Sequence, residues 1–413
     1  MDTLRATDAD GARVKSSRIA RATPRTAAAS PKILLYSHDT FGLGNISRSL
    51  LLGRMLSDAH PRAAILLVTG SPMIHAFRIP DRLDYVKLPC VNRVNADEYE
   101  PRFLADCGHE VRQTRSDILE RTAVAFRPDL VIVDKRAAGI DGELLPSLAA
   151  LERQAIPPKV VLGLRDILDA PSVTRRALRA NGSFDVIDRF YDEVWIYGSR
   201  DVFDAVTEYA FPASVAAKTQ YCGYLRRHAV RRMPHAEAPR VLVTAGGGGD
   251  GSPLIRTYLE GLATLPHGAF DTVVVLGPQL APDTANELRR LSAGRPDVEF
   301  VEFEPDLTRR YEHADIAVSM AGYNTVCELL TAGVRAVLVP RAEPVQEQLI
   351  RARRLTAAGH FRTIEPAELT PARLIADLRA ALETPLSSPS RIDMEGLTRI
   401  RARVQRLLKA RLS

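Results

Sequence analysis

The sequence is poor in residues that crosslink a chain and in runs that anchor it in a membrane. It holds only four cysteines in 413 residues, far apart and without a Cys-x-x-Cys pair. This spacing argues against disulfides and a zinc site, and it is typical of a reducing compartment. No apolar run approaches the ~18 to 20 residues of a membrane-spanning helix, and residues 1–30 lack the apolar core of a signal peptide. We therefore expect a cytoplasmic protein that begins with a disordered tail at residues 1–30.

The body of the chain also lacks a basic excess. The formal net charge is +6, but residues 1–30 hold six basic and three acidic side chains, and residues 399–411 hold six basic and none acidic. These two ends contribute +3 and +6, so residues 31–398 carry a net charge of −3. A body of that charge offers no counterpart to a phosphate backbone, and we expect no nucleic-acid partner.

What the chain does contain is a repeated alternation of β-branched runs and helical stretches. The first half has the runs KILLYS, AAILLVT, DLVIVD, KVVLGL and EVWIYG, and the rhythm restarts at RVLVTAGGGGDG. Such alternation gives a parallel sheet covered by helices on both faces. We predict an α/β protein with two Rossmann-like doubly wound domains, divided as a domain at 31–224, a linker at 225–239, a domain at 240–385 and a basic amphipathic helix at 386–413.

Three strand-to-helix loops are candidate ligand sites, because ligands of such sheets bind beyond the carboxyl ends of the strands. The first loop holds Gly42, Gly44 and Asn45 in the pattern G-x-G-x-x-S. No acidic residue follows the next strand at the place that would hold an adenosine ribose, so a nicotinamide-type site fits poorly. We expect these glycines to face a cleft, and a tight turn without a ligand is the alternative.

The second loop is a run of four glycines that directly follows a predicted strand. Backbone without side chains at Gly246, Gly247 and Gly248 lets amide N–H groups approach a diphosphate closely. The loop has no G-K-[ST], so it is not a Walker A loop. The alternative is that the glycines only permit a sharp turn.

The third loop opens the helix in SMAGYNTVCELLTAG. Gly322 forms the turn, and Tyr323, Asn324 and Thr325 then stand at the positive end of the helix. Glu328, one turn further in, can accept hydrogen bonds from two ribose hydroxyls. The alternative is an ordinary helix cap and a solvated glutamate.

Several of these residues also occur in a pattern that resembles a known protein family. Residues 240–360, and above all the run VEFEPDLTRRYEHADIAVSMAGYNTVCELLTAGVRAVLVPRAEPVQEQLIRARRL, resemble the carboxyl-terminal domain of glycosyltransferase family 28. This family includes the N-acetylglucosaminyltransferase that makes lipid II. The stretch YSHDTFGLGN resembles the amino-terminal glycine loop of predicted family 28-like transferases. The resemblance implies the GT-B fold, with the nucleotide-sugar donor on the second domain and the acceptor on the first.

The resemblance also implies donor contacts, residue by residue. It places Glu328 at the ribose, Tyr323, Asn324 and Thr325 around the diphosphate, and three residues at the base, which are Phe303, Glu304 and Leu307. It also places Arg227, in the linker, near the donor phosphate, and Glu347 and Gln348 at the donor sugar. The family has glutamine where this chain has Glu347, so the identity of the sugar is open.

The proposed chemistry needs charge stabilisation on the leaving diphosphate and a base for the acceptor hydroxyl. The one D-x-D pattern lies in the tail at residues 8–10, so we expect no metal and no cofactor, only the nucleotide-sugar co-substrate. In the lipid II enzyme a histidine stands where this chain has Asn45, whose amide cannot act as a base and is expected to position a ligand. Four residues at strand ends of the first domain are candidate bases, namely His38, Asp39, Asp134 and Asp166.

The sequence therefore predicts a metal-independent glycosyltransferase that uses a nucleotide-diphosphate sugar, expected to be a UDP-sugar. A nucleotide-sugar hydrolase or epimerase and a non-catalytic nucleotide-sugar-binding protein remain as alternatives. The acceptor stays open between a lipid-linked and a small molecule. The last helix, apolar on one side and rich in arginine on the other, either packs back toward the first domain or lies on the inner face of the membrane as a peripheral contact.

Overall fold

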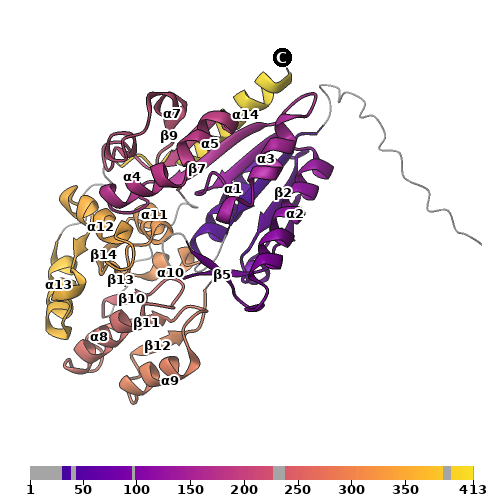
Figure 1. Ribbon diagram of the computed structural model, residues 1–413. Coiled ribbons are helices and arrows are strands. Elements are labelled where there is room, and N and C mark those ends of the chain that lie inside the picture. The colour runs from indigo at the N-terminus through magenta and orange to yellow at the C-terminus, as the bar shows by residue number, and fades with distance from the viewer. Residues whose placement is uncertain are drawn as a thin grey trace, which may run out of the picture. The chain divides into compact units, whose positions relative to one another are not determined.

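The first half of the chain forms a seven-stranded parallel sheet in the order β3-β2-β1-β6-β7-β8-β9 (Figure 1). The computed structural model describes residues 30–38, 43–94, 98–226, 238–304, 306–384 and 392–412. The strands of this sheet are β1 (Lys32–Ser37), β2 (Ala64–Thr69), β3 (Leu83–Lys87), β6 (Leu130–Asp134), β7 (Lys159–Arg165), β8 (Glu193–Tyr197) and β9 (Thr219–Tyr221). The helices of this half are α1 (Gly44–Ala59), α2 (Gly108–Phe126), α3 (Leu145–Glu152), α4 (Pro171–Ala180), α5 (Ser183–Phe190), α6 (Ala205–Glu208) and α7 (Ala213–Lys218).

Helices cover both faces of this sheet because its strands are apolar on both sides. In β1, Ile33 and Leu35 join one buried cluster, and the alternate residues Leu34 and Tyr36 join another. Helix α1 packs on the first face, and α2 and α3 pack on the second. A strand with two buried faces reads as a continuous apolar run, which is the pattern that predicted a parallel sheet.

The second half forms a six-stranded parallel sheet in the order β12-β11-β10-β13-β14-β15. Its strands are β10 (Arg240–Thr244), β11 (Asp271–Val275), β12 (Val298–Val301), β13 (Ile316–Ser319), β14 (Arg335–Leu338) and β15 (Arg362–Thr363). Its helices are α8 (Ser252–Ala263), α9 (Pro282–Leu291), α10 (Thr308–His313), α11 (Tyr323–Ala332), α12 (Glu347–Ala357) and α13 (Pro371–Glu383). The predicted fold class, α/β with two doubly wound domains, is confirmed.

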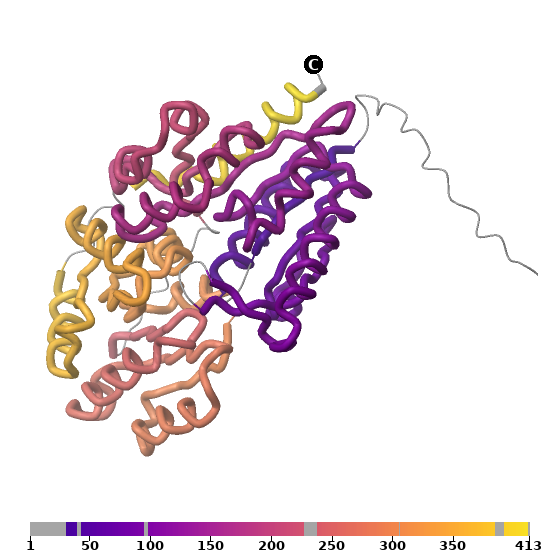
Figure 2. The backbone as a smooth tube through the Cα atoms, in the orientation of Figure 1, coloured from indigo at the N-terminus to yellow at the C-terminus, as the bar shows by residue number. Residues whose placement is uncertain are grey.

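One hydrophobic cluster runs through both halves. It contains Ile46 and Leu50 of α1 together with Val326 and Leu329 of α11, and the tube in Figure 2 follows these distant segments into the same region. Helices α1 and α11 contact each other directly. Because this cluster buries side chains of both sheets, the loops that follow their strands are brought to a common space.

The last helix, α14 (Gly396–Leu412), packs on the first sheet. It contacts α1, β6 and β7, and its apolar side chains Ile400 and Val404 are fully buried. Its arginines pair with acidic residues of the first half, with 3.0 Å between Arg403 Nη1 and Glu193 Oε2. None of the helices in the described ranges is long and apolar enough to cross a membrane.

A small antiparallel hairpin stands apart from the two main sheets. Its strands are β4 (Val91–Arg93) and β5 (Tyr99–Pro101). Side chains of Arg93 and Tyr99 line the cavity described below, and Val94 is 49% exposed. The hairpin therefore joins the cavity to the protein surface.

Candidate functional site

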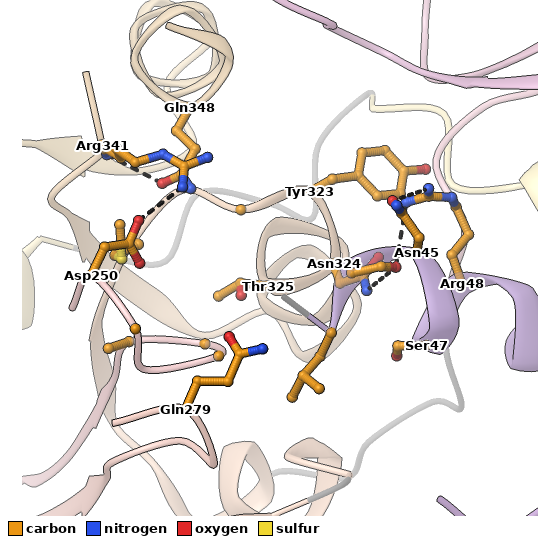
Figure 3. A pocket seen from close by; sticks show the side chains of 18 of the residues that line it. Asn45, Ser47, Arg48, Asp250, Gln279, Tyr323, Asn324, Thr325, Arg341 and Gln348 are labelled. Carbon is orange, nitrogen blue, oxygen red and sulfur yellow. Dashed lines mark hydrogen bonds and ion pairs between the residues drawn. The ribbon is translucent and has the colours of Figure 1, made fainter. Parts of the chain in front are cut away.

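A cavity of about 670 Å³ lies between the two sheets. Its lining residues follow β1, β6 and β7 on one side and β10 to β14 on the other. Both sheets thus contribute the carboxyl ends of their strands, where ligands of doubly wound domains bind. The volume is in the range of small-molecule sites. Figure 3 shows part of the lining.

The four-glycine loop forms one wall of the cavity, but its glycines have different roles. Gly246 and Gly247 line the cavity. Gly248 is buried and has a φ of +90°, and a Cβ there would lie 2.5 Å from the carbonyl oxygen of Leu276. The predicted donor contact at Gly248 is therefore better explained as a structural requirement, since only glycine fits this backbone.

The amino-terminal end of α11 points at the cavity. Gly322 is its N-cap residue, and Asn324, Thr325 and Glu328, three of the predicted donor contacts, line the cavity from the first turns. Asn324 Nδ2 donates to the carbonyl oxygen of Gly44 at 3.0 Å, so this end also contacts the first domain (Figure 3). The unsatisfied N–H groups at this helix end favour an anion.

Tyr323, predicted beside the diphosphate, has its ring in the interface between the domains. The ring is 3% exposed, stacks on Tyr224 with 6.0 Å between centroids, and has the guanidinium carbons of Arg48 and Arg351 at 5.8 and 5.7 Å. The backbone amide of Tyr323 remains at the helix end. Its side chain joins the domains, which sequence reasoning did not foresee.

The loop after β12 supplies the three residues predicted at the nucleobase. Phe303, Glu304 and Leu307 all line the cavity. The Glu304 carboxylate is 3.7 Å from Arg310 Nε. The ring of Phe77, from the first domain, packs edge-on against Phe303 with 6.2 Å between centroids. Residues of both domains therefore meet at this end of the cavity.

Glu347, the departure from the family's glutamine, is held by three arginines, of which Arg351 is fully buried. Its carboxylate lies 2.8 Å from Arg165, 3.4 Å from Arg351 and 3.8 Å from Arg341. Burial raises the pKa of this carboxyl, but the arginines outweigh burial and lower the pKa to about 2. Gln348 also lines the cavity, and its Oε1 accepts from the Arg341 backbone N–H at 3.2 Å. The glutamate is thus a charged link between the domains, and glutamine could not balance these cations.

Two of the four candidate bases, Asp134 and Asp166, form buried ion pairs with arginines. Asp134 is bound by Arg48 in a bidentate pair, with 2.7 Å between Nη2 and Oδ2. Asp166 accepts from Arg351, with 2.6 Å between Nη2 and Oδ1, and from the Tyr224 hydroxyl at 2.9 Å. Neither aspartate is among the described residues that line the cavity. Because a general base must reach the proton it removes, these positions argue for a structural role.

His38 lines the cavity and is buried at the end of β1. Its Nε2 is 3.3 Å from Asn45 Nδ2, and Asn45 Oδ1 accepts from Arg48 Nη2 at 2.9 Å. The arginine fixes the orientation of the amide, so Nε2 is the ring nitrogen that accepts. Burial, followed by the cations Lys135, Arg136 and Arg48, holds the pKa of His38 well below its usual range. His38 is therefore neutral at neutral pH, the form that can take up a proton.

Sequence reasoning missed a group of basic residues on the first domain's side of the cavity. Arg93, Lys135 and Arg165 all line the cavity. Burial, followed by Arg165, lowers the pKa of Lys135 well below the lysine value, although Glu347 acts in the opposite direction. Lys135 has a φ of +66°, directly after β6. No motif marks these residues, because they are brought together only by the order of strands in the sheet.

Three predicted residues, Asp39, Gly42 and Arg227, lie outside the described residues, as do the tail before Ser30 and residues 227–237 of the predicted linker. Gly44 and Asn45, the described part of the first glycine loop, line the cavity. The prediction that this loop faces a cleft agrees with their position.

Comparison with known proteins finds relatives of the second half of the chain. A family model described as the glycosyltransferase family 28 C-terminal domain matches residues 240–406. A curated relative from Corynebacterium efficiens is 32% identical over 150 residues, which cover 36% of this chain and 39% of the relative. One from Halorhodospira halophila is 32% identical over 190 residues, covering 42% of this chain and 52% of the relative. Both are named UDP-N-acetylglucosamine--N-acetylmuramyl-(pentapeptide) pyrophosphoryl-undecaprenol N-acetylglucosamine transferase.

Solved structures extend the likeness to both domains. MurG of Acinetobacter baumannii superposes with a TM-score of 0.59 at 16% identity, covering 91% of this chain and 99% of that one. The calicheamicin glycosyltransferase CalG4 does so with a TM-score of 0.56 at 17% identity, covering 93% and 95%. At this identity the likeness shows the fold, while the sequence match spans only 39% and 52% of the two curated relatives. Residues 240–406 therefore match the glycosyltransferase family 28 C-terminal domain, and the two sheets of the chain have the GT-B fold.

Proposed function

We propose that this protein transfers a sugar from a UDP-sugar to an acceptor hydroxyl. The observation that carries the proposal is a cavity that is lined both by the glycine loop and the α11 helix start of the domain matching family 28 and by His38 of the other domain. The relatives in this family are named as transferases that use UDP-N-acetylglucosamine. The hydrolase, epimerase and non-catalytic alternatives gain no support from these comparisons.

The donor would lie along the second domain. Phe303, Glu304 and Leu307 would hold the base, and Glu328 would accept from the ribose hydroxyls. The diphosphate would meet the free N–H groups at the start of α11 and the backbone of the four-glycine loop. Glu347 and Gln348 stand where the sugar would follow.

The reaction would proceed by displacement at the anomeric carbon. The acceptor oxygen forms the new bond to that carbon, the bond to the diphosphate oxygen breaks, and its electron pair leaves with UDP. The acceptor proton moves to Nε2 of His38, which requires the Asn45 amide to yield its place to the acceptor hydroxyl. His38 is favoured over Asp134 and Asp166 because their carboxylates are held by buried arginines.

We further propose that no metal takes part. The helix end and glycine loop supply fixed positive dipoles for the charge that develops on the leaving diphosphate. Within the described ranges, no three His, Cys, Asp or Glu side chains lie close enough together to hold a metal ion. The test is activity after exhaustive treatment with EDTA, and a loss restored by magnesium would refute the proposal.

The acceptor would carry a negative charge and a lipid. Arg93, Lys135 and Arg165 place basic groups on the first domain's wall of the cavity, and such groups can pair with a phosphate or a carboxylate. The relatives are named for a pyrophosphoryl-undecaprenol acceptor. Close to this wall, Phe103 and Leu104 are 70% and 53% exposed just after β5, so an apolar chain or a peripheral membrane contact would find exposed apolar side chains there.

The first experiment is binding of UDP followed by thermal unfolding, with magnesium and with EDTA. A ligand at ~100 times its dissociation constant adds about 2.7 kcal/mol of stability. Glu328→Ala should abolish the UDP shift, while His38→Gln should keep it and lose transfer of labelled N-acetylglucosamine from UDP-N-acetylglucosamine to a polyprenyl-pyrophosphate-linked acceptor. Wild-type protein that gains no stability from any nucleoside diphosphate would contradict the proposed function.

A further inference from the structure

The base end of the cavity contains a residue that the donor domain does not supply. Phe77 belongs to the first domain, beyond β2, and lies at the end of a short 3-10 turn (Ile74–Ala76). Its ring meets the ring of Phe303 at 6.2 Å between centroids and an interplanar angle of 82°. Both rings are half-buried and line the cavity. The contact therefore joins the acceptor side of the protein to the loop that would hold the nucleobase.

Hydrogen bonds before and after the turn, together with the burial of Ile74, hold the segment that contains Phe77. The backbone N–H of Ser71 donates to Thr69 Oγ1 at 3.1 Å, and the N–H of Met73 donates to Ser71 Oγ at 3.3 Å. Ile74 is 2% exposed in the cluster shared by both domains. After the turn, Ser57 Oγ of α1 donates to the carbonyl oxygen of Asp81 at 2.6 Å. These contacts hold the backbone on both sides of Phe77 within the fold of the first domain.

The chemistry of this end suits a flat heterocycle. Phe77, Phe303, Leu307 and Val275 give it an apolar lining. A nucleobase has two apolar faces and a polar edge, so it needs a ring or an aliphatic group against a face and backbone groups at the edge. An edge-to-face pair of phenylalanines leaves ring surface turned to the cavity, against which a base can stack.

Resting on the proposed function, we propose that Phe77 is a nucleobase contact, so that the donor base is held between side chains of both domains. The base site is then complete only when the two domains are arranged as they are here. Donor binding and the contact between the domains consequently favour each other, and the acceptor wall is in place when the donor is bound.

The test compares three probes, UDP, uridine and inorganic pyrophosphate, by calorimetric titration of the full chain. Phe77→Ala should weaken UDP and uridine about tenfold, equivalent to about 1.4 kcal/mol, and leave pyrophosphate binding unchanged. Phe77→Tyr should restore most of the affinity because the ring is kept. Phe190→Ala is the matched control, since that ring is also half-buried and does not line the cavity. The thermal midpoint of each variant without ligand shows whether it is folded.

Two outcomes overturn the inference without touching the proposed function. One is unchanged UDP affinity in folded Phe77→Ala. The other is an equal loss of UDP and pyrophosphate affinity, which would mean that the ring acts only on the arrangement of the domains. If the wild-type protein binds neither UDP nor uridine, the proposed function fails and the inference falls with it.

Discussion

Replacing Glu347 by glutamine tests whether the arginines around the cavity depend on this carboxylate. The substitution keeps the shape of the side chain and removes one negative charge. In the native protein the Glu347 side chain is 5% exposed and lies 2.8 Å from Arg165 and 3.4 Å from Arg351. Among the residues that the structure describes, the variant leaves Arg165 without an acidic partner and Arg351 with Asp166 alone. A buried charge that loses its partner is costly, so we expect a less stable protein.

The magnitude follows from the pKa of the carboxyl. Folding lowers the pKa of Glu347 from 4.5 to about 2, and at ~1.4 kcal/mol per pKa unit this corresponds to roughly 3 kcal/mol. Because the folded-state pKa is below the unfolded value, the stabilisation is fully present above about pH 4.5. It declines as the pH falls between 4.5 and 2 and is absent below that range.

The measurement is urea unfolding of both proteins at several pH values. We expect Glu347→Gln to be less stable by roughly 3 kcal/mol at pH 7, with the difference shrinking as the pH is lowered below 4.5. Glu152→Gln is the control, because the side chains of its ion pair with Arg189 are 62% and 43% exposed and such pairs contribute about 0 to 1 kcal/mol. A difference of 3 kcal/mol that persists unchanged at low pH would show that packing and not charge is responsible, and no difference at pH 7 would refute the reasoning entirely.

The site leads to three further predictions, two on substitutions and one on the pH dependence of the transfer rate. Asp166→Asn should cost about 3 to 5 kcal/mol in urea unfolding, because it breaks the buried pair with Arg351 between the domains. Gly248→Ala should lower the thermal midpoint and weaken UDP binding, because its φ is +90° and a Cβ would lie 2.5 Å from Leu276 O. The transfer rate at saturating substrate should stay constant as the pH falls from 8 through 6.5 and decline only below that, because the folded state holds the pKa of His38 well below 6.5 and the neutral ring is the base.

Each of these has an outcome that contradicts it. For the aspartate, a cost no larger than that of Glu152→Gln would mean that water reaches the pair. For the glycine, Gly294→Ala is the comparison, since Gly294 also has a positive φ, +81°, but no atom within 4 Å of an added Cβ. Equal effects at the two glycines would remove the argument from close approach. For the histidine, a rate that already falls by half near pH 6.5 would indicate an exposed ring or another base.

Local sequence patterns were enough to predict the two parallel sheets and the group of residues around Glu328. Both parallel sheets follow from apolar runs buried on two faces, and the cluster around Glu328 follows from glycine, polar residues and a carboxylate spaced along one helix start. The short strands β9 and β15 have two or three residues each and carry no such pattern. They are strands only because neighbouring strands offer them partners.

The candidate bases show where sequence reasoning ends. His38, Asp134 and Asp166 all stand at strand ends of the first domain and look equivalent along the chain. The distinction comes from Arg48, 86 residues from Asp134, and Arg351, 185 residues from Asp166. A partner at such a separation has no local signature, so only the tertiary structure separates paired aspartates from the histidine that faces the cavity.

The two doubly wound domains, the glycine loops and the polar start of α11 could be predicted from the amino-acid sequence, because strand burial, backbone permissiveness and helix dipoles are local properties. The tertiary structure decided which charges are neutralised and which face the cavity. It turned Glu347 into a charged link between the domains and gathered Arg93, Lys135 and Arg165 into one wall. It also set Phe77 against Phe303. These outcomes depend on distances between segments far apart in the chain, and ion pairing, burial and ring contact act only over such distances in space.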